Sequence, residues 1–429
     1  TRYAVEGNSS LNFKFTDGDQ LGAAIIDQYD PQKPIEQWDV IYSLAGNNPF
    51  TYGANADEWK SATRLGIGHY LYVYPYNAED NNRAAVSYSL PTIQELYQTE
   101  DGAVDLNAAI EKGNKAVYSN ILDEDNLTLE ASLKNLYAYP KFVINFDNGQ
   151  NVTSVSKVVL EYDDNANGII EEGEGFAVKG GFNHKDVANL FANPKTDWDN
   201  IQTADFVIDE TDADYNTAKD YTTVEYSRYL IAKLPKNAKV QTNSVTNNKY
   251  IEVRFMMPSG LDNVYGNGEL NMYIYTNNGV YKINDVFGSI VFKDTTPEEL
   301  KARVFARNTS FTLNMSTLTS ANKVNDNLNI VTNVEDWNNL VSAYGSFEKF
   351  TATDPLKVAV VGDDFTLNAS AKMPSKAIFE ITTEVKVEGE VTLSNVQVAN
   401  TVTVEEGATL TTSGSFTATK VENNGTMNI

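Results

Sequence analysis

Short pairs of apolar residues recur along the last quarter of the chain, and this repeat restricts the fold more than any other feature. Gly, Asn, Asp or Glu separates one pair from the next. The pairs are Val358/Val360, Phe365/Leu367, Ile378/Ile381, Val385/Val387, Val391/Leu393, Val396/Val398 and Val402/Val404. Short strands spaced by about five to seven residues suggest a β-solenoid, in which each rung stacks on the next. An ordinary small β-sandwich is the alternative.

A short amphipathic helix is predicted immediately before this repeat. In the segment 334–344, Trp337, Leu340 and Val341 fall on one helical face. A helix at the start of a solenoid covers the open end of the first rung. The sequence therefore predicts a helix-capped, solenoid-like module over residues 328–429.

Strand patterns dominate the rest of the chain. The 429 residues correspond to two or three domains, and 24 Tyr and 19 Phe with abundant Val and Thr favour strands over helices. Apolar and polar residues alternate, or apolar runs are bounded by turns, in 11–15, 21–26, 69–76, 142–146, 152–162, 251–255, 270–275 and 280–283. One further helix is predicted over 104–117. The expected class is all-β.

Charge and composition exclude several functions. The chain has 33 Lys and Arg against 58 Asp and Glu, so nucleic acid and anionic membrane surfaces would repel it. It has no Cys and two His, which removes disulfides, thiol nucleophiles and cysteine-based zinc sites. No stretch of 18 apolar residues occurs, so no membrane span is expected. We expect a protein without enzymatic activity and without a nucleic-acid partner.

The segment 163–174 has the spacing of a twelve-residue calcium loop. Oxygen-bearing side chains occupy positions 1, 3, 5, 9 and 12, and Gly168 at position 6 permits the sharp turn. The expected ligands of a structural Ca²⁺ are Asp163, Asn165, Asn167, the carbonyl of Ile169, Glu171 and Glu174. A strand is expected before the loop, unlike a helical EF-hand. An acidic, solvated turn is the alternative.

Other chemistry-bearing residues have structural interpretations. Both His69 and His184 lie away from any nucleophile motif, and we expect a structural role for each. The four Trp side chains could stack on a sugar, although a single Trp in a β-sandwich is usually part of the core. The adjacent acids at 363–364, 405–406 and 209–212 are expected to be solvated surface rather than glycosidase carboxylates.

Five segments occur in an order that points to a known family. They are Thr1-Arg2, Phe13–Gly22 with its Asp17-Gly18-Asp19-Gln20-Leu21-Gly22, Trp59, Leu71–Tyr76 and Leu90–Gln94. Each piece is short and permissive, and the order and spacing carry the signal. Together they resemble the N-terminal domain of the fimbrillins of Bacteroidales-type (type V) pili, and the resemblance covers about residues 1 to 325.

The resemblance implies two transthyretin-like β-sandwich domains, which we place at 1–138 and 139–327. It also implies export as a lipoprotein, a place on the cell surface in a fimbrium of the outer membrane, cleavage after a basic residue and assembly by β-strand donation. Arg2 is the expected processing residue. The family's lipid-bearing Cys is not in this sequence, so outer-membrane anchoring would depend on a leader that is missing here.

One departure from the family affects the expected role. Polymerising stalk subunits end with the segment that they donate, whereas here a module of about a hundred residues follows the second sandwich. We therefore expect a tip or accessory adhesin, with other pilus subunits and an unidentified host or bacterial surface ligand as partners. Two alternatives stay open: a secreted carbohydrate-binding or carbohydrate-cleaving protein, and a monomer in which Arg2 has no processing role.

Overall fold

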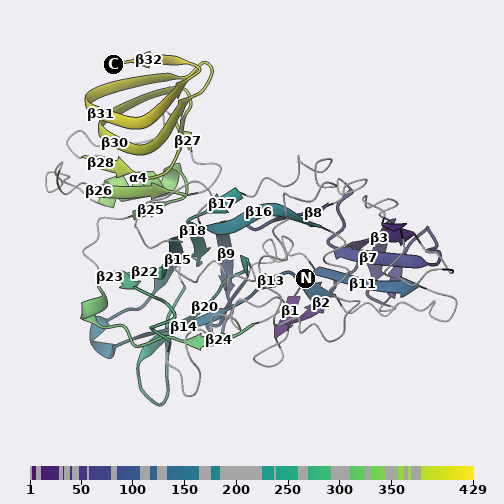
Figure 1. Ribbon diagram of the computed structural model, residues 1–429. Coiled ribbons are helices and arrows are strands. Elements are labelled where there is room, and N and C mark those ends of the chain that lie inside the picture. The colour runs from purple at the N-terminus through teal and green to yellow at the C-terminus, as the bar shows by residue number, and fades with distance from the viewer. Residues whose placement is uncertain are drawn as a thin grey trace. The chain divides into compact units, whose positions relative to one another are not determined.

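The computed structural model describes two compact units, Thr1–Val324 and Asn325–Ile429, and each is taken here on its own (Figure 1). The described residues are 2–5, 11–28, 32, 39–40, 48–55, 58–78, 85–106, 116–122, 133–163, 175–183, 225–235, 238–258, 269–290, 310–323, 329–343, 353, 356–361, 366–368 and 378–429.

The first region of unit 1 is built on a seven-stranded sheet. Its strands are β12 (Lys134–Asn135), β11 (Ala116–Leu122), β7 (Gly68–Tyr74), β3 (Gln20–Gln28), β5 (Asn48–Gly53) and β6 (Glu58–Lys60) in spatial order, with β4 (Asp39–Val40) paired to β3. One face carries an apolar cluster that includes Leu21, Tyr72 and Leu122. The strands predicted around 21–26 and 69–76 are confirmed, since they are β3 and β7.

Two smaller sheets belong to the same unit. The strands β1 (Arg2–Val5) and β2 (Leu11–Lys14) form an antiparallel pair. A three-stranded sheet joins β8 (Ala85–Ser89), β16 (Phe176–Asn183) and β17 (Glu225–Ser227), with β16 in the middle.

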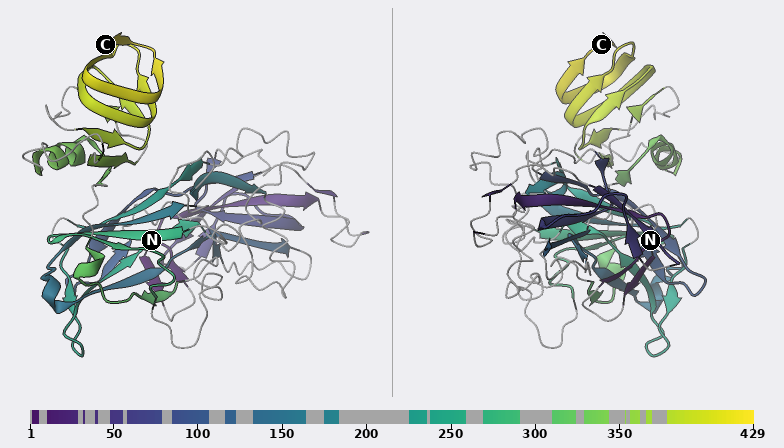
Figure 2. Two further views of the ribbon diagram at one scale, coloured as in Figure 1. Left: turned by 60° about the vertical axis from the view of Figure 1, so that its left-hand side comes forward. Right: turned by 90° about the vertical axis from the view of Figure 1, so that its right-hand side faces the viewer.

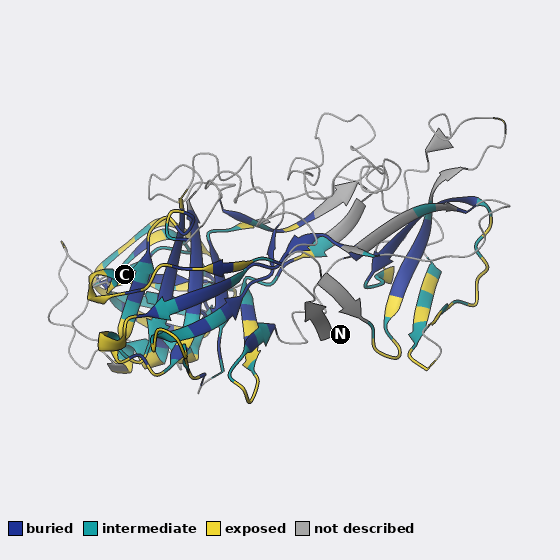
Figure 3. Ribbon diagram, turned by 90° about the horizontal axis from the view of Figure 1, so that it is seen from below, coloured by how far each residue is buried: buried dark blue, intermediate teal, exposed yellow. Residues whose placement is uncertain are grey.

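The second region of unit 1 is a sandwich of two sheets. The six-stranded sheet has the order β10 (Val104–Leu106), β9 (Ile93–Gln98), β18 (Tyr229–Lys233), β15 (Val155–Asp163), β22 (Glu269–Thr276) and β23 (Gly279–Ile283). The four-stranded sheet has the order β19 (Gln241–Thr242), β20 (Lys249–Arg254), β14 (Lys141–Phe146) and β24 (Thr312–Asn314). Buried residues of both sheets share one core, which Figure 3 shows in dark blue. A further pair joins β13 (Tyr137–Ala138) to β21 (Met257–Pro258).

The helix predicted over 104–117 is wrong at both of its ends, and residues 107–115 lie outside the described residues. Residues Val104–Leu106 are strand β10, and Ala116 begins strand β11. Val104 and Leu106 alternate with the less buried Asp105 and lie opposite Gln98 and Leu96 of β9. Pairing with a neighbouring strand and burial of alternate side chains therefore override the weak helical periodicity.

The strands β9 and β10 join the second sandwich although they precede residue 139. In sequence they lie between β7 and β11, which are neighbours in the seven-stranded sheet. Strand β9 pairs in parallel with β18, and Leu96, Val104 and Leu106 belong to the core of the sandwich. The domain limits expected at 138 and 327 stay a prediction, because the division by contacts keeps residues 1–324 in one unit.

Unit 2 is a β-solenoid with one helix after its first described strand, so the expected all-β class with a solenoid-like C-terminal module is confirmed (Figure 2). The helix α4 (Val334–Ala343) matches the predicted segment, and Trp337 is fully buried. The parallel strands are β25 (Asn329–Val331), β26 (Leu356–Val360), β27 (Thr366–Leu367), β28 (Phe379–Ile381), β29 (Val385–Val387), β30 (Glu390–Val404), β31 (Thr409–Asn423) and β32 (Thr426–Asn428).

The solenoid core is made of stacked columns of apolar side chains. Phe379, Val396 and Phe416 form one column, because β28 pairs with β30 and β30 pairs with β31 in this register, and all three side chains pack in the core. Phe379 and Ile381, rather than Ile378, supply the inward residues of β28. The apolar pattern therefore repeats from β28 and β29 to β30, whereas on β31 Val421 is exposed and Asn423 lies opposite Val404.

Candidate functional site

The last strand of unit 1 closes one edge of the four-stranded sheet. Strand β24 pairs in parallel with β14, where Phe142 lies opposite Leu313. The amides of Met315 and Leu318 donate to the carbonyls of Val143 and Asn145, at 3.0 and 2.8 Å. We call residues 310–318 the closing strand.

Alternate side chains of the closing strand complete the core of the sandwich. Leu313, Met315 and Leu318 are each at most 3% exposed and belong to the same cluster as Phe142 and Ile144. Burial of one such side chain stabilises a fold by about 1.5–3 kcal/mol. Loss of the closing strand would leave an apolar groove beside the unpaired backbone of β14.

The opposite side of the closing strand is also occupied. Ser316 donates its backbone N–H and its hydroxyl to the carbonyl of Ser289, each at 2.8 Å. Met315 forms an isolated antiparallel bridge with Ile290. The closing strand is therefore held on both sides by its own chain.

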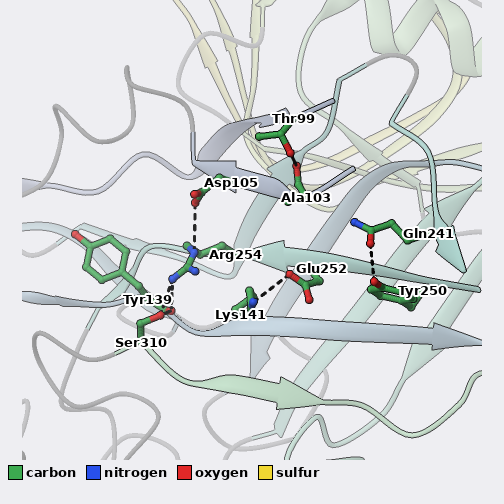
Figure 4. Close-up of polar contacts among 10 residues, drawn as sticks. All are labelled: Thr99, Ala103, Asp105, Tyr139, Lys141, Gln241, Tyr250, Glu252, Arg254 and Ser310. Atoms are coloured by element: carbon green, nitrogen blue, oxygen red, sulfur yellow. Dashed lines mark hydrogen bonds and ion pairs between the residues drawn. The ribbon is translucent and has the colours of Figure 1, made fainter. Parts of the chain in front are cut away.

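A buried guanidinium anchors the start of the closing strand. Arg254 is 7% exposed, and its Nη1 donates to the hydroxyl of Ser310 at 2.5 Å and to the carbonyl of Tyr139 at 3.5 Å (Figure 4). Ser310 donates to the same carbonyl at 3.1 Å. The Nε of Arg254 lies 3.4 Å from Oδ1 of Asp105, an ion pair without hydrogen-bond geometry.

The charge of Arg254 is costly to bury. Burial lowers the pKa of the guanidinium below its ordinary value, and the negative charges of Asp105 and Glu252 act against that shift. Arginine remains charged at neutral pH all the same. A buried charge needs its partners, and removal of one partner typically costs several kcal/mol.

Two side-chain amides attach strand β9 to the sandwich. The amide of Gln94 binds both backbone groups of Met256, and the amide of Gln98 binds both backbone groups of Lys239. Each amide acts as an extra strand residue, with one donor and one acceptor. With Asp105, they fix the β9–β10 hairpin at three points.

The seven-stranded sheet ends in a short edge strand with a half-buried aromatic cluster. In β6, exposed Glu58 and Lys60 flank Trp59. The ring of Trp59 lies 4.8 Å from Phe15 and 5.2 Å from Tyr52, centroid to centroid. Charges beside a three-residue edge strand oppose unspecific pairing with another chain.

The expected calcium ligands are largely outside the described residues. Asp163 is the last residue of β15 and lies opposite Glu269 of β22. The other expected ligands lie outside the described ranges: Asn165, Asn167, Ile169, Glu171 and Glu174. In the parts of the chain that the structure describes, no three His, Cys, Asp or Glu residues are grouped to hold a metal ion. Calcium binding stays a prediction.

The expected processing residue lies in a paired strand. Arg2 opens β1, opposite Lys14 of β2, and cleavage after it stays a prediction. His69 is 4% exposed in β7, between Ile121 and Asp27 of the neighbouring strands, in keeping with a structural role. His184 lies outside the described residues.

Of the four Trp residues, Trp337 belongs to the solenoid core and Trp59 to the aromatic cluster of the first sheet. Trp38 and Trp198 are not among the described residues. Of the adjacent acids, Glu405 is half-buried and Glu406 exposed, whereas 209–212 and 363–364 are not described. Within the described ranges, no helix has the length and hydrophobicity of a membrane span.

Sequence reasoning missed the cluster around Arg254. Its members Asp105, Arg254 and Ser310 come from three distant segments, and no local motif joins them. A weak signal exists in Ile251–Phe255, where an arginine stands in an otherwise strand-like alternation. Such a residue is expected to find a partner or solvent, and the sequence does not say which.

No protein-family model and no curated protein matches this sequence significantly. Among solved structures, a candidate cell adhesion protein from Bacteroides uniformis is similar over 72% of this chain and 89% of its own, with 8% identity and a TM-score of 0.37. A second, from Bacteroides ovatus, matches over 63% and 77%, with 10% identity and a TM-score of 0.31.

A candidate adhesin from Bacteroides thetaiotaomicron matches over 72% of this chain and 86% of its own, with 10% identity and a TM-score of 0.30. These similarities are too loose to assign a function. The chain is defined as an all-β protein with a closed sandwich edge in unit 1 and a helix-capped solenoid in unit 2.

Proposed function

We propose that the chain is a non-enzymatic adhesin of a bacterial cell surface, and a tip or accessory subunit of a type V pilus. In this role, unit 1 joins the pilus by accepting a β-strand at its first sandwich. Unit 2 is the module that meets a host or bacterial surface ligand. The order of the five segments from Thr1-Arg2 to Leu90–Gln94 supports the family, and strand acceptance at the first sandwich follows from that resemblance.

The closing strand is the observation that carries the tip or accessory role. A stalk subunit keeps its last strand free for donation, whereas here residues 310–318 are hydrogen-bonded to β14 and buried within their own sandwich. The chain then continues into the solenoid. A strand that is hydrogen-bonded in cis on both sides is a poor donor, which supports the proposal that this subunit does not donate.

Cleavage-dependent assembly tests the proposal. The precursor with its leader is incubated with trypsin and a stalk subunit that carries a free donor strand. We expect an SDS-resistant, heat-sensitive complex that forms only after cleavage. Arg2→Gln is expected to abolish the complex, and Lys14→Gln, at the paired position of β2, is the matched control that leaves it intact.

Two outcomes would count against the proposal. A complex that forms equally in Arg2→Gln, or no complex from the cleaved wild-type protein, would contradict strand acceptance. For the adhesive role, beads coated with the full chain are compared with beads coated with unit 1 in binding to epithelial and bacterial cells. Equal binding of the two preparations would remove unit 2 as the adhesive module.

A further inference from the structure

One guanidinium holds two segments of unit 1 that are far apart in the sequence. Arg254 contacts Asp105 of the β9–β10 hairpin through Nε and Ser310 of the closing strand through Nη1 (Figure 4). The hairpin borders the six-stranded sheet, and the closing strand borders the four-stranded sheet. Two edges on different sheets therefore share one buried charge.

The hairpin is connected to the first sheet at both of its ends. The chain leaves that sheet after β7, forms β8, β9 and β10, and returns as β11, which pairs with β7 over seven residues. A change in the pairing of β7 and β11 would therefore move both tethers of the hairpin. Asp105, at the middle of β10, is the hairpin residue that would carry this displacement to Arg254.

Loss of either partner affects the other. If Asp105 moves away, the guanidinium keeps Ser310 and the Tyr139 carbonyl but loses the carboxylate that it contacts, and a buried charge with fewer partners is destabilised. Residues in one polar network are energetically coupled, so a change at one member alters the stability that the others contribute. Such coupling is reciprocal by thermodynamic necessity.

We propose that Arg254 is a positioning residue that couples the β9–β10 hairpin to the closing strand. The first sheet, which accepts a strand in the proposed function, thereby controls how firmly the closing strand is held on β14. This regulation rests on the proposed function. The coupling itself is a property of the isolated chain and is measured without any assembly.

Hydrogen exchange of the full chain tests the coupling in both directions. In Asp105→Asn the side chain keeps an oxygen that can accept from Leu106 N–H but loses its charge. We expect the amides of Met315 and Leu318 to exchange about tenfold faster than in wild type. Asp101→Asn, an exposed acid at the turn of the same hairpin, is the matched control and is expected to leave both amides unchanged.

The reciprocal arm uses Ser310→Ala, which removes the hydroxyl that binds Arg254. We expect faster exchange at Val104 and Leu106 in β10, whereas Ser316→Ala, which removes a different hydroxyl of the closing strand, leaves β10 unchanged. In Arg254→Met, addition of Asp105→Asn is expected to have no further effect on the closing strand.

Purely local roles give a different result, in which each substitution alters only its own segment. That result, or additive effects of Asp105→Asn and Arg254→Met, would overturn the coupling. The outcome is separable from the assembly test: local effects together with a trypsin-dependent complex would refute the coupling and leave strand acceptance intact. Coupled exchange without any complex would support the coupling and refute strand acceptance.

Discussion

The side-chain amide of Gln94 binds the backbone of Met256 twice, with Oε1 accepting from N at 2.8 Å and Nε2 donating to O at 2.6 Å. Gln94 is fully buried, and Met256 follows the end of β20 in the opposite sheet. One side chain thus bridges the two sheets of the second sandwich. Both backbone groups of Met256 depend on it for these hydrogen bonds.

Replacement of Gln94 by Ala is expected to destabilise unit 1 by about 3 kcal/mol, because two buried backbone groups lose their partner. Gln98 makes the same kind of contact with Lys239 in a more exposed place, and Gln98→Ala should cost about 1 kcal/mol. Urea unfolding followed by circular dichroism gives both values. Equal losses in the two variants would show that burial of the amide is not the cause.

Substitutions of the two described Trp residues measure the stabilities of the two units separately. Trp337 is fully buried with its ring 5.4 Å from Phe379, and Trp337→Ala should destabilise unit 2 by about 3–5 kcal/mol. Trp59→Ala should lower the unfolding temperature of unit 1 alone. Differential scanning calorimetry of the full chain is the measurement. A shift of both transitions by either variant would contradict the assignment of each Trp to the core of a single unit.

Calcium binding at 163–174 is tested with the metal itself. If Asp163, Asn165, Asn167 and Glu174 hold Ca²⁺, titration at millimolar Ca²⁺ gives measurable heat and raises the melting temperature of unit 1. Asp163→Ala removes both effects, and Glu406→Ala, which removes an exposed acid of unit 2, leaves them. Neither heat nor stabilisation in the wild-type protein would mean that the segment is an acidic turn.

Two glycines with positive φ differ in the space around them. Gly175 has φ of +112°, and a Cβ built on it would lie 2.6 Å from the carbonyl oxygen of Ser227. Gly389 has φ of +68° and nothing within 4 Å of its Cβ position. Gly389→Ala should cost about 1 kcal/mol from backbone strain alone, and Gly175→Ala at least about 3 kcal/mol. Thermal unfolding of both variants checks the order, and equal costs would mean that backbone contact is relieved at Gly175.

The sequence predicted the elements whose signal is local. Alternation of apolar and polar residues predicted β14 and β22, and helical periodicity predicted α4. In each case the spacing of the apolar residues within the segment defines the buried face. The same reasoning failed at 104–106. There Val104 and Leu106 fit either a helical or a strand periodicity. Pairing with β9, which exists only in the folded chain, makes the segment a strand.

The contacts of the candidate site were beyond sequence reasoning for a related physical reason. Asp105, Arg254 and Ser310 meet because two sheets and a returning strand bring them together, and each residue looks ordinary in its own segment. In the solenoid the apolar pairs were predicted, yet Phe379 replaces Ile378 as the inward residue of β28. The sequence of one strand does not determine which of two adjacent apolar residues points inward. Pairing with the neighbouring rungs determines it.

Register in the solenoid also determines how this module can change in length. Val402 lies opposite Val385 on one side and Val421 on the other, so one rung is a self-contained unit of chain that meets only its two neighbours. Duplication or deletion of a whole rung changes contacts only between the rungs that border the change. A shift by a few residues instead turns apolar side chains outward along the entire stack. The length of this module can therefore evolve in steps of one whole rung.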